Sequence, residues 1–324
     1  MSKNLTSVWG HNKPRNKYSE SPHWVLPKEL IGVEFEYEGV LIRSIAAEEY
    51  NTYYTAVDDG SLRDEGKEFV FTTPLFGADL VDALNEMGVM ANKHNFRTTY
   101  RTSVHVHLDV RDLSAQEIHK LCVLYTLFER SLFAFIGDNR EANNFCIPWY
   151  RSNTYFNTIS LLKTSPDPGR AMNEAIGGMQ RYSALNLVSM REHGSLEFRH
   201  MGGTLDMNRV KTWINMIMSL KKACKTLQFD DYNILAHLST VGPEALVRSV
   251  FGNLLDDYWT PAAIWDGVLE TQNLLVHSEQ LSFISPIEKY LSQTKPGKLA
   301  SNFVKVTVNG SANHQFATLD TENE

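Results

Sequence analysis

Apolar and polar residues alternate strictly in several short segments of the chain, which is typical of half-buried β-strands. In residues 31–37, the apolar Val33 and Phe35 alternate with Glu34 and Glu36. Successive side chains of a strand point to opposite faces, so the two glutamates share one face. Further strands are predicted at residues 67–72, 102–110, 182–188 and 194–201, the last two joined by a hairpin at 192–194.

Helical patterns lie between and after these strands. Ser114 and Glu117 form a capping-box pattern at the start of an apolar run that ends near Gly137. Asp206 is placed to cap a helix that ends near Thr226. Further helices are predicted at residues 77–93 and, as short segments, within residues 242–294.

The pattern divides the chain into a structured body with polar ends. The expected parts are an N-terminal arm (1–27), a core (28–228), a helical C-terminal part of the same domain (229–295) and a polar tail (296–324). The core contains one long loop-rich segment, residues 138–180. Such segments inside compact domains are often functional.

Composition and charge narrow the classes of function. The 324 residues are 43% hydrophobic and 21% charged, as in ordinary globular proteins. Lys and Arg number 31 against 38 Asp and Glu, a net charge of −7, so a nucleic-acid partner is not expected. The longest apolar stretch, residues 121–136, is interrupted by Glu129 and Arg130, so no membrane association is expected.

The cysteines point to a reducing compartment. There are three, Cys122, Cys146 and Cys224, an odd count with no short-range pairing. Cys122 and Cys224 fall inside apolar helical patterns, where buried free thiols are expected. The N-terminus also lacks an apolar signal core, so we expect a cytoplasmic protein.

Ionisable side chains occur at a spacing of two residues on several of the predicted strands. Taken singly, each pair is explained as the solvated face of an edge strand or as a cross-strand ion pair. If the strands share a sheet, however, their polar faces line one cavity, where carboxylates repel one another unless divalent cations neutralise them. Oxygen ligands with an imidazole suit Mg²⁺ or Mn²⁺, and arginines beside them suit phosphate. The residues concerned are Glu34, Glu36, Glu68, His105, His107, Glu197 and Arg199.

These motifs form an ordered series that resembles a known family. The series comprises Gly32-Val-Glu-Phe-Glu36, Asp59-Gly-Ser-Leu, Gly66-Lys-Glu68-Phe-Val, Ser103-Val-His-Val-His107-Leu, Tyr182-Ser-Ala-Leu-Asn186, Ser195-Leu-Glu-Phe-Arg-His200 and Gly203-Thr-Leu-Asp206. Over residues 30–225 it looks like the amidoligases of bacteria and phages, which are glutamine-synthetase-like carboxylate–amine ligases. The resemblance implies an α+β fold, in which a curved antiparallel sheet carries the site on one face and helices cover the other.

The resemblance also implies roles for individual side chains. The implied metal ligands are Glu34, Glu36, Glu68, His105 and Glu197. The implied contacts with nucleotide, phosphate or carboxylate substrate are His107, Arg199, Arg181, Asn186 and Arg101. Catalytic roles fall to Arg199, Glu68 and Arg181, and either Asp59 or Glu65 would supply a further metal carboxylate.

The activity implied is ATP-dependent formation of an amide through an acyl phosphate, with two Mg²⁺ ions. Its partners would be small or peptide carboxylate and amine substrates, with ammonia supplied directly or by a partner protein. Residues 138–180 are a candidate lid, in which Trp149, Tyr150 and Tyr155 either close over the substrate or simply pack at the surface. The alternatives are a guanidino-kinase-like phosphotransferase, a non-catalytic nucleotide-binding module, and a zinc hydrolase with ligands His105 and His107.

Overall fold

The computed structural model describes most of the body of the chain. The described residues are 29–40, 53–137, 139–151, 162, 173, 174, 176, 177, 179–227 and 233–278. The predicted N-terminal arm and polar tail, and most of the predicted lid with Tyr155, lie outside them. The division of the chain at residue 228 stays a prediction.

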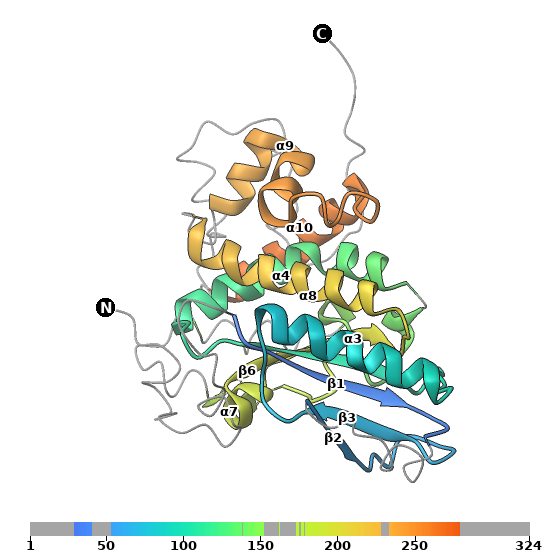
Figure 1. Cartoon of the computed structure of the whole chain (residues 1–324). Coiled ribbons are helices and arrows are strands. Elements are labelled where there is room, and N and C mark those ends of the chain that lie inside the picture. Colours follow the sequence, from blue (N-terminus) through green and yellow to red (C-terminus); the bar gives the residue numbers. More distant parts are fainter. Residues whose placement is uncertain are drawn as a thin grey trace.

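A six-stranded open sheet forms one layer of the protein (Figure 1). The strand order is β2-β3-β1-β4-β6-β5, and each pair of neighbours is antiparallel. The strands are β1 (Ile31–Tyr37), β2 (Tyr54–Val57), β3 (Lys67–Phe71), β4 (Ser103–Asp109), β5 (Leu185–Asn186) and β6 (Ser195–Gly202). The α+β class with an antiparallel sheet is therefore confirmed.

The register of the sheet aligns the polar positions of neighbouring strands. Glu36 of β1 lies opposite Glu68 of β3, and Glu34 lies opposite His105 of β4. On the other side of β4, His107 lies opposite Glu197 of β6. Side chains opposite one another in adjacent strands share a face, so the register gathers these groups on one side of the sheet.

Two layers of helices cover the apolar face of the sheet (Figure 1). The inner layer consists of α3 (Gly77–Lys93), α4 (Ala115–Ile136) and α8 (Met207–Thr226), and the outer layer of α9 (Asn233–Phe251) and α10 (Pro261–Ser278). Three short elements lie outside these layers: η2 (Arg140–Ala142), η3 (Trp149–Arg151) and α7 (Ser189–His193).

The predicted helix caps are present. The Ser114 side chain accepts a hydrogen bond from the backbone of Glu117, whose carboxylate accepts one from the Ser114 backbone, as in a capping box. The Asp206 carboxylate accepts from the backbone amides of Asn208 and Arg209 at the start of α8. These contacts satisfy amide groups that the helix itself leaves without partners.

The outer helices pack closely on the inner layer and share its core. Ile264, Val268 and Leu275 of α10 are fully buried in the same apolar cluster as the sheet. Gly267 permits this approach, because a Cβ there would lie 2.0 Å from the carbonyl oxygen of Leu127 in α4. The described residues 233–278 thus extend the core of the sheet and its helices.

The structure corrects the prediction for residues 182–194. Within the predicted strand 182–188, only Leu185 and Asn186 pair with β6, and Ser183 forms an isolated bridge with Ile147. Helix α7 replaces the predicted hairpin at 192–194. The Asn186 side chain accepts from the Val188 amide, which turns the chain out of the sheet. Gly194 then ends α7 with a positive φ of 68°.

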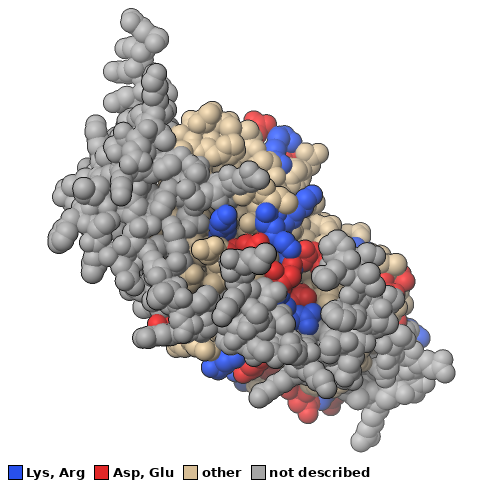
Figure 2. Space-filling model, turned by 90° about the vertical axis from the view of Figure 1, so that its left-hand side faces the viewer, with Lys and Arg blue, Asp and Glu red and all other residues tan. Residues whose placement is uncertain are grey.

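No helix within the described ranges is long and apolar enough to cross a membrane. All three cysteines are buried and free, which confirms the prediction for Cys122 and Cys224. On the face shown in Figure 2, acidic and basic side chains lie next to one another near the centre, and the described atoms of that face form no continuous basic surface.

Candidate active site and metal centre

The polar face of the sheet carries a cavity of about 390 Å³. Nine of the ten predicted site residues line it: Glu34, Glu36, Glu68, His105, His107, Arg181, Asn186, Glu197 and Arg199. Arg101 is the exception, because it lines a neighbouring cavity instead. Residues from five strands or their adjoining segments thus converge on one side of the sheet, as the spacing of two predicted.

His105 lies at the centre of the carboxylates. Its Nδ1 is 3.0 Å from Glu34 Oε2 and 3.5 Å from Glu197 Oε1. Its Nε2 is 3.9 Å from Glu36 Oε1 and 2.8 Å from the hydroxyl of Ser103, which also donates to Glu36 Oε2 over 2.6 Å. The imidazole therefore reaches carboxylates on both neighbouring strands.

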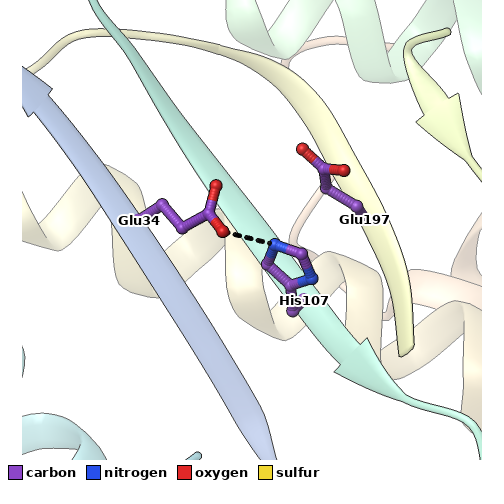
Figure 3. Close-up of side chains that lie close together, drawn as sticks. All are labelled: Glu34, His107 and Glu197. Carbon is purple, nitrogen blue, oxygen red and sulfur yellow. Dashed lines mark hydrogen bonds and ion pairs between the residues drawn. The ribbon is translucent and has the colours of Figure 1, made fainter. Parts of the chain in front are cut away.

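His107 is held from both ring nitrogens. Its Nε2 is 3.0 Å from Glu34 Oε1 (Figure 3). Its Nδ1 is 3.0 Å from the Ser195 hydroxyl and 3.2 Å from the Ser189 hydroxyl. Figure 3 shows Glu34, His107 and Glu197 projecting toward one another from three adjacent strands. The two serines fix the ring plane so that Nε2 faces the carboxylates.

Glu197 and Arg199 form a charged pair at the edge of the cavity. The guanidinium Nη1 of Arg199 contacts Glu197 Oε1, and the Asn186 amide donates to Glu197 Oε2 over 2.7 Å. Burial would raise the pKa of Glu197, but Arg199 and the two histidines hold it below its ordinary value. Glu197 is therefore an ionised carboxylate at neutral pH.

The pKa values of Glu34 and Glu68 are also shifted by their neighbours in the cavity. Burial alone would raise the pKa of Glu34, but the facing histidines hold it well below its usual range. Burial, together with the adjacent Glu34 and Glu36, raises the pKa of Glu68 to about 9. Crowded carboxylates thus keep a proton on Glu68, and a bound divalent cation would take the place of that proton.

The charge of the cavity fits two divalent cations. Six carboxylates and two arginines line it, which leaves four formal negative charges when all carboxylates are ionised and the histidines are neutral. Oxygen donors with imidazole nitrogens suit Mg²⁺ or Mn²⁺. Three groups have ligand atoms within 4.8 Å of one another: Glu34, His107 and Glu197; Glu34, Glu68 and His105; and Glu36, Asp59 and Glu68.

The structure separates the two residues considered for a further metal carboxylate. Asp59 lines the cavity and falls within ligand distance of Glu36 and Glu68, whereas Glu65 is exposed and does not line it. The Asp59 carboxylate also accepts from the Ser61 amide over 2.6 Å, which fixes its turn.

Sequence reasoning missed residues that line the cavity, and two serines that do not line it but hydrogen-bond to its histidines. Ser103 precedes His105 by two positions and Ser195 precedes Glu197 by two, so the same spacing that marked the strands could have identified both serines. Ser189 and His193 carried no such signal, because they lie on α7, which was not predicted.

One of the predicted lid aromatics is part of the core. Trp149 is fully buried, lies 4.9 Å from the ring of Tyr125, and donates from its indole nitrogen to the carbonyl of Leu185. It is therefore not placed to close over a substrate, and it packs in the core rather than at the surface, so neither expectation holds for this residue.

Part of the chain that carries the site matches a known protein family. Residues 70–221 match a family model described as "Putative amidoligase enzyme". Over these residues the chain is similar to the amidoligase family. The matched region carries His105, His107, Glu197 and Arg199, while Glu34 lies before it and joins the site through the pairing of β1 with β4. No curated protein matches the chain.

Proposed function

We propose that this protein uses ATP to join a carboxylate to an amine, through an acyl phosphate and with two divalent cations. The observation that carries the proposal is one cavity in which six carboxylates outnumber two arginines by four formal charges, within reach of two imidazoles. The match of residues 70–221 to the amidoligase family model supports the ligase class. The glutamine-synthetase-like relation of the fold is part of the same proposal.

The cations would be Mg²⁺ or Mn²⁺. Glu36, Asp59 and Glu68 would hold one, and Glu34 and Glu197 with an imidazole would hold the other. When bound, such ions neutralise the charge of the nucleotide phosphates and of the phosphoryl group in transfer. The assignment revises the expectation from resemblance in one respect, because His107 lies as close to Glu34 as His105 does.

The residues of the chain would orient and stabilise the reacting groups. A substrate carboxylate oxygen attacks the γ-phosphorus of ATP, and ADP leaves with the bridging oxygen. Arg199 and Arg181 line the cavity and would hold the negative charge of the transferred phosphoryl group. The amine nitrogen then attacks the carbonyl carbon of the acyl phosphate, phosphate leaves, and the nitrogen loses a proton to form the amide. The two substrates, and any protein that supplies ammonia, are proposed by class only.

Release of ADP and phosphate from Mg-ATP tests the proposal. Glu34→Gln and His105→Ala should abolish turnover with the fold intact by circular dichroism, because each removes a group from the centre of the cation site. Glu65→Gln is the matched control, since Glu65 is exposed and outside the cavity. Turnover in Glu34→Gln equal to that in Glu65→Gln would refute the cation assignment. ADP without phosphate would indicate phosphoryl transfer to a stable acceptor instead.

A further inference from the structure

A second and larger cavity adjoins the candidate active site. It has a volume of about 700 Å³ and is lined by residues around the start of β4, the end of β6 and the segment 139–145. Arg199 lies close to both cavities, because it lines the first and its Nε donates to the carbonyl of Phe145, which lines the second. A ligand in the second cavity can therefore place one end beside Arg199.

The second cavity has the opposite charge to the first. None of its described lining residues is acidic, and two, Arg101 and Arg140, are cationic. Arg140 is buried and donates to the backbone carbonyls of Arg199 and His200, which fixes its charge in the wall. The cavity thus attracts an anion and would not compete for the divalent cations.

Two exposed aromatic side chains line this cavity. Tyr100 is 77% exposed and has the Arg101 guanidinium 4.9 Å from its ring centre. Phe145, 39% exposed, packs edge-on against Tyr182 at 5.4 Å. Exposed aromatic side chains that flank a pocket provide apolar contact area for a ligand.

The rest of the lining can both donate and accept hydrogen bonds. Three threonines and three asparagines lie among the lining residues: Thr98, Thr99, Thr102, Asn139, Asn143 and Asn144. Thr99, Thr102 and Asn143 already hydrogen-bond within the chain. The hydroxyl and amide groups of Thr98, Asn139 and Asn144 match the N–H and C=O groups of peptide bonds. At roughly 30 Å³ for each water-sized group, the volume has room for about 20 such groups, more than a free amino acid fills.

We propose that the second cavity binds the carboxylate substrate, and that this substrate is an anionic oligopeptide rather than a free amino acid. The proposal rests on the ligase function proposed above. The peptide places its reacting carboxylate beside Arg199, its amide groups against the threonines and asparagines, and an apolar side chain against Tyr100. Arg101 attracts a second negative charge on the peptide.

The test uses a pool of N-acetylated tetrapeptides that end in glutamate, with free glutamate for comparison. Formation of ADP and hydroxamate in the presence of Mg-ATP and hydroxylamine gives KM and kcat, and the anisotropy of a fluorescein-labelled pool measures binding directly. The pool should be turned over with a kcat/KM at least about tenfold above that of glutamate, because the peptides gain an aromatic contact and a charge contact that glutamate lacks.

Two variants locate the effect. Tyr100→Ala and Arg101→Gln should each raise KM and the dissociation constant of the labelled pool by about fivefold to tenfold. Tyr258→Ala and Arg248→Gln are matched controls on surfaces away from both cavities, and they should change neither constant. Equal efficiency for glutamate and the pool, or a change below about twofold in both cavity variants, would overturn the proposal.

Calorimetry with Mg-ATP on the same preparations keeps the two proposals apart. Mg-ATP binding together with hydroxamate formed from glutamate alone would overturn the peptide assignment and leave the ligase standing. A protein that binds no Mg-ATP and forms no hydroxamate from any carboxylate would overturn the ligase function, and the peptide assignment with it.

Discussion

Glu129 provides a quantitative test of the packing behind the active site. It lies on α4, is buried, and accepts hydrogen bonds from the Tyr125 hydroxyl (2.6 Å), the Trp149 amide (2.7 Å) and the Tyr150 amide (3.2 Å). Burial nevertheless outweighs these contacts and raises the pKa of Glu129 from 4.5 to about 7. Between these two pH values, the folded chain holds a proton that the unfolded chain has lost.

The sign and size of the effect follow from that proton. Because the folded state binds it more tightly, the free energy of unfolding falls as the pH rises from about 4.5 to about 7. At about 1.4 kcal/mol for each pH unit, the total is about 3 kcal/mol. The glutamine in Glu129→Gln cannot ionise, so the free energy of unfolding of this variant lacks the pH-dependent contribution. It also loses the acceptor for the Tyr150 amide, at a cost of about 1 to 3 kcal/mol that does not change with pH.

The neighbouring His200 opposes this effect and must be separated from it. Burial, with a contribution from Arg140, lowers the pKa of His200 to about 3, so His200 destabilises the fold as the pH drops below 6.5. His200 is present in both wild type and Glu129→Gln, so its contribution cancels when the free energies of unfolding of the two proteins are subtracted.

Urea unfolding followed by tryptophan fluorescence measures this difference at several pH values between 4 and 8. As the pH rises across that range, the free energy of unfolding of wild type should fall by about 3 kcal/mol relative to that of Glu129→Gln. Glu244→Gln, an exposed helical site, is the matched control and should give a constant difference. Infrared titration should also show a carboxyl band that titrates near pH 7 in wild type and is missing in Glu129→Gln, whereas the band of Glu68 titrates near pH 9 in both proteins. If the difference in the free energy of unfolding between wild type and Glu129→Gln does not change with pH, the assignment of the raised pKa to Glu129 is refuted.

Three further predictions address the cations, the phosphate contact and a helix cap. Mg²⁺ or Mn²⁺ at 100 times its dissociation constant should raise the free energy of unfolding by about 2.7 kcal/mol, and Glu36→Gln should remove most of this gain in a thermal-shift titration. Arg199→Lys should lower kcat/KM for Mg-ATP by at least about tenfold, because an ammonium cannot reproduce a two-point phosphate contact; a twofold loss would indicate a structural role. Asp206→Ala should lower stability in urea by about 1 kcal/mol, and an unchanged midpoint would contradict the importance of the cap.

Local patterns in the sequence predicted the parts of the fold that depend on short-range chemistry. The alternation in residues 31–37 and 103–109 identified the central strands β1 and β4, and Ser114 and Asp206 located two helix starts, because a cap needs only adjacent residues. Strand β2 was missed, since Tyr54–Val57 is too short to show a period and is an edge strand whose one neighbour in the sheet is β3.

The candidate site was predictable to the extent that it follows strand periodicity. Glu34, His105 and Glu197 could be grouped on one face from spacing alone, but their pairing across the sheet depends on register, which spacing does not determine. The choice between Asp59 and Glu65 depended on the path of a turn. The second cavity could not be predicted, because residues far apart in the chain, 98–102, 139–145 and 202–203, form it.

Trapping of the acyl phosphate tests the central claim most directly. Wild type, Mg-ATP and hydroxylamine are incubated with a carboxylate pool, and hydroxamate is measured together with ADP and phosphate. The account predicts hydroxamate that depends on both ATP and carboxylate, is absent in Glu197→Gln, and forms at the wild-type rate in Glu65→Gln. ADP formation without hydroxamate, or hydroxamate that persists in Glu197→Gln, would contradict it.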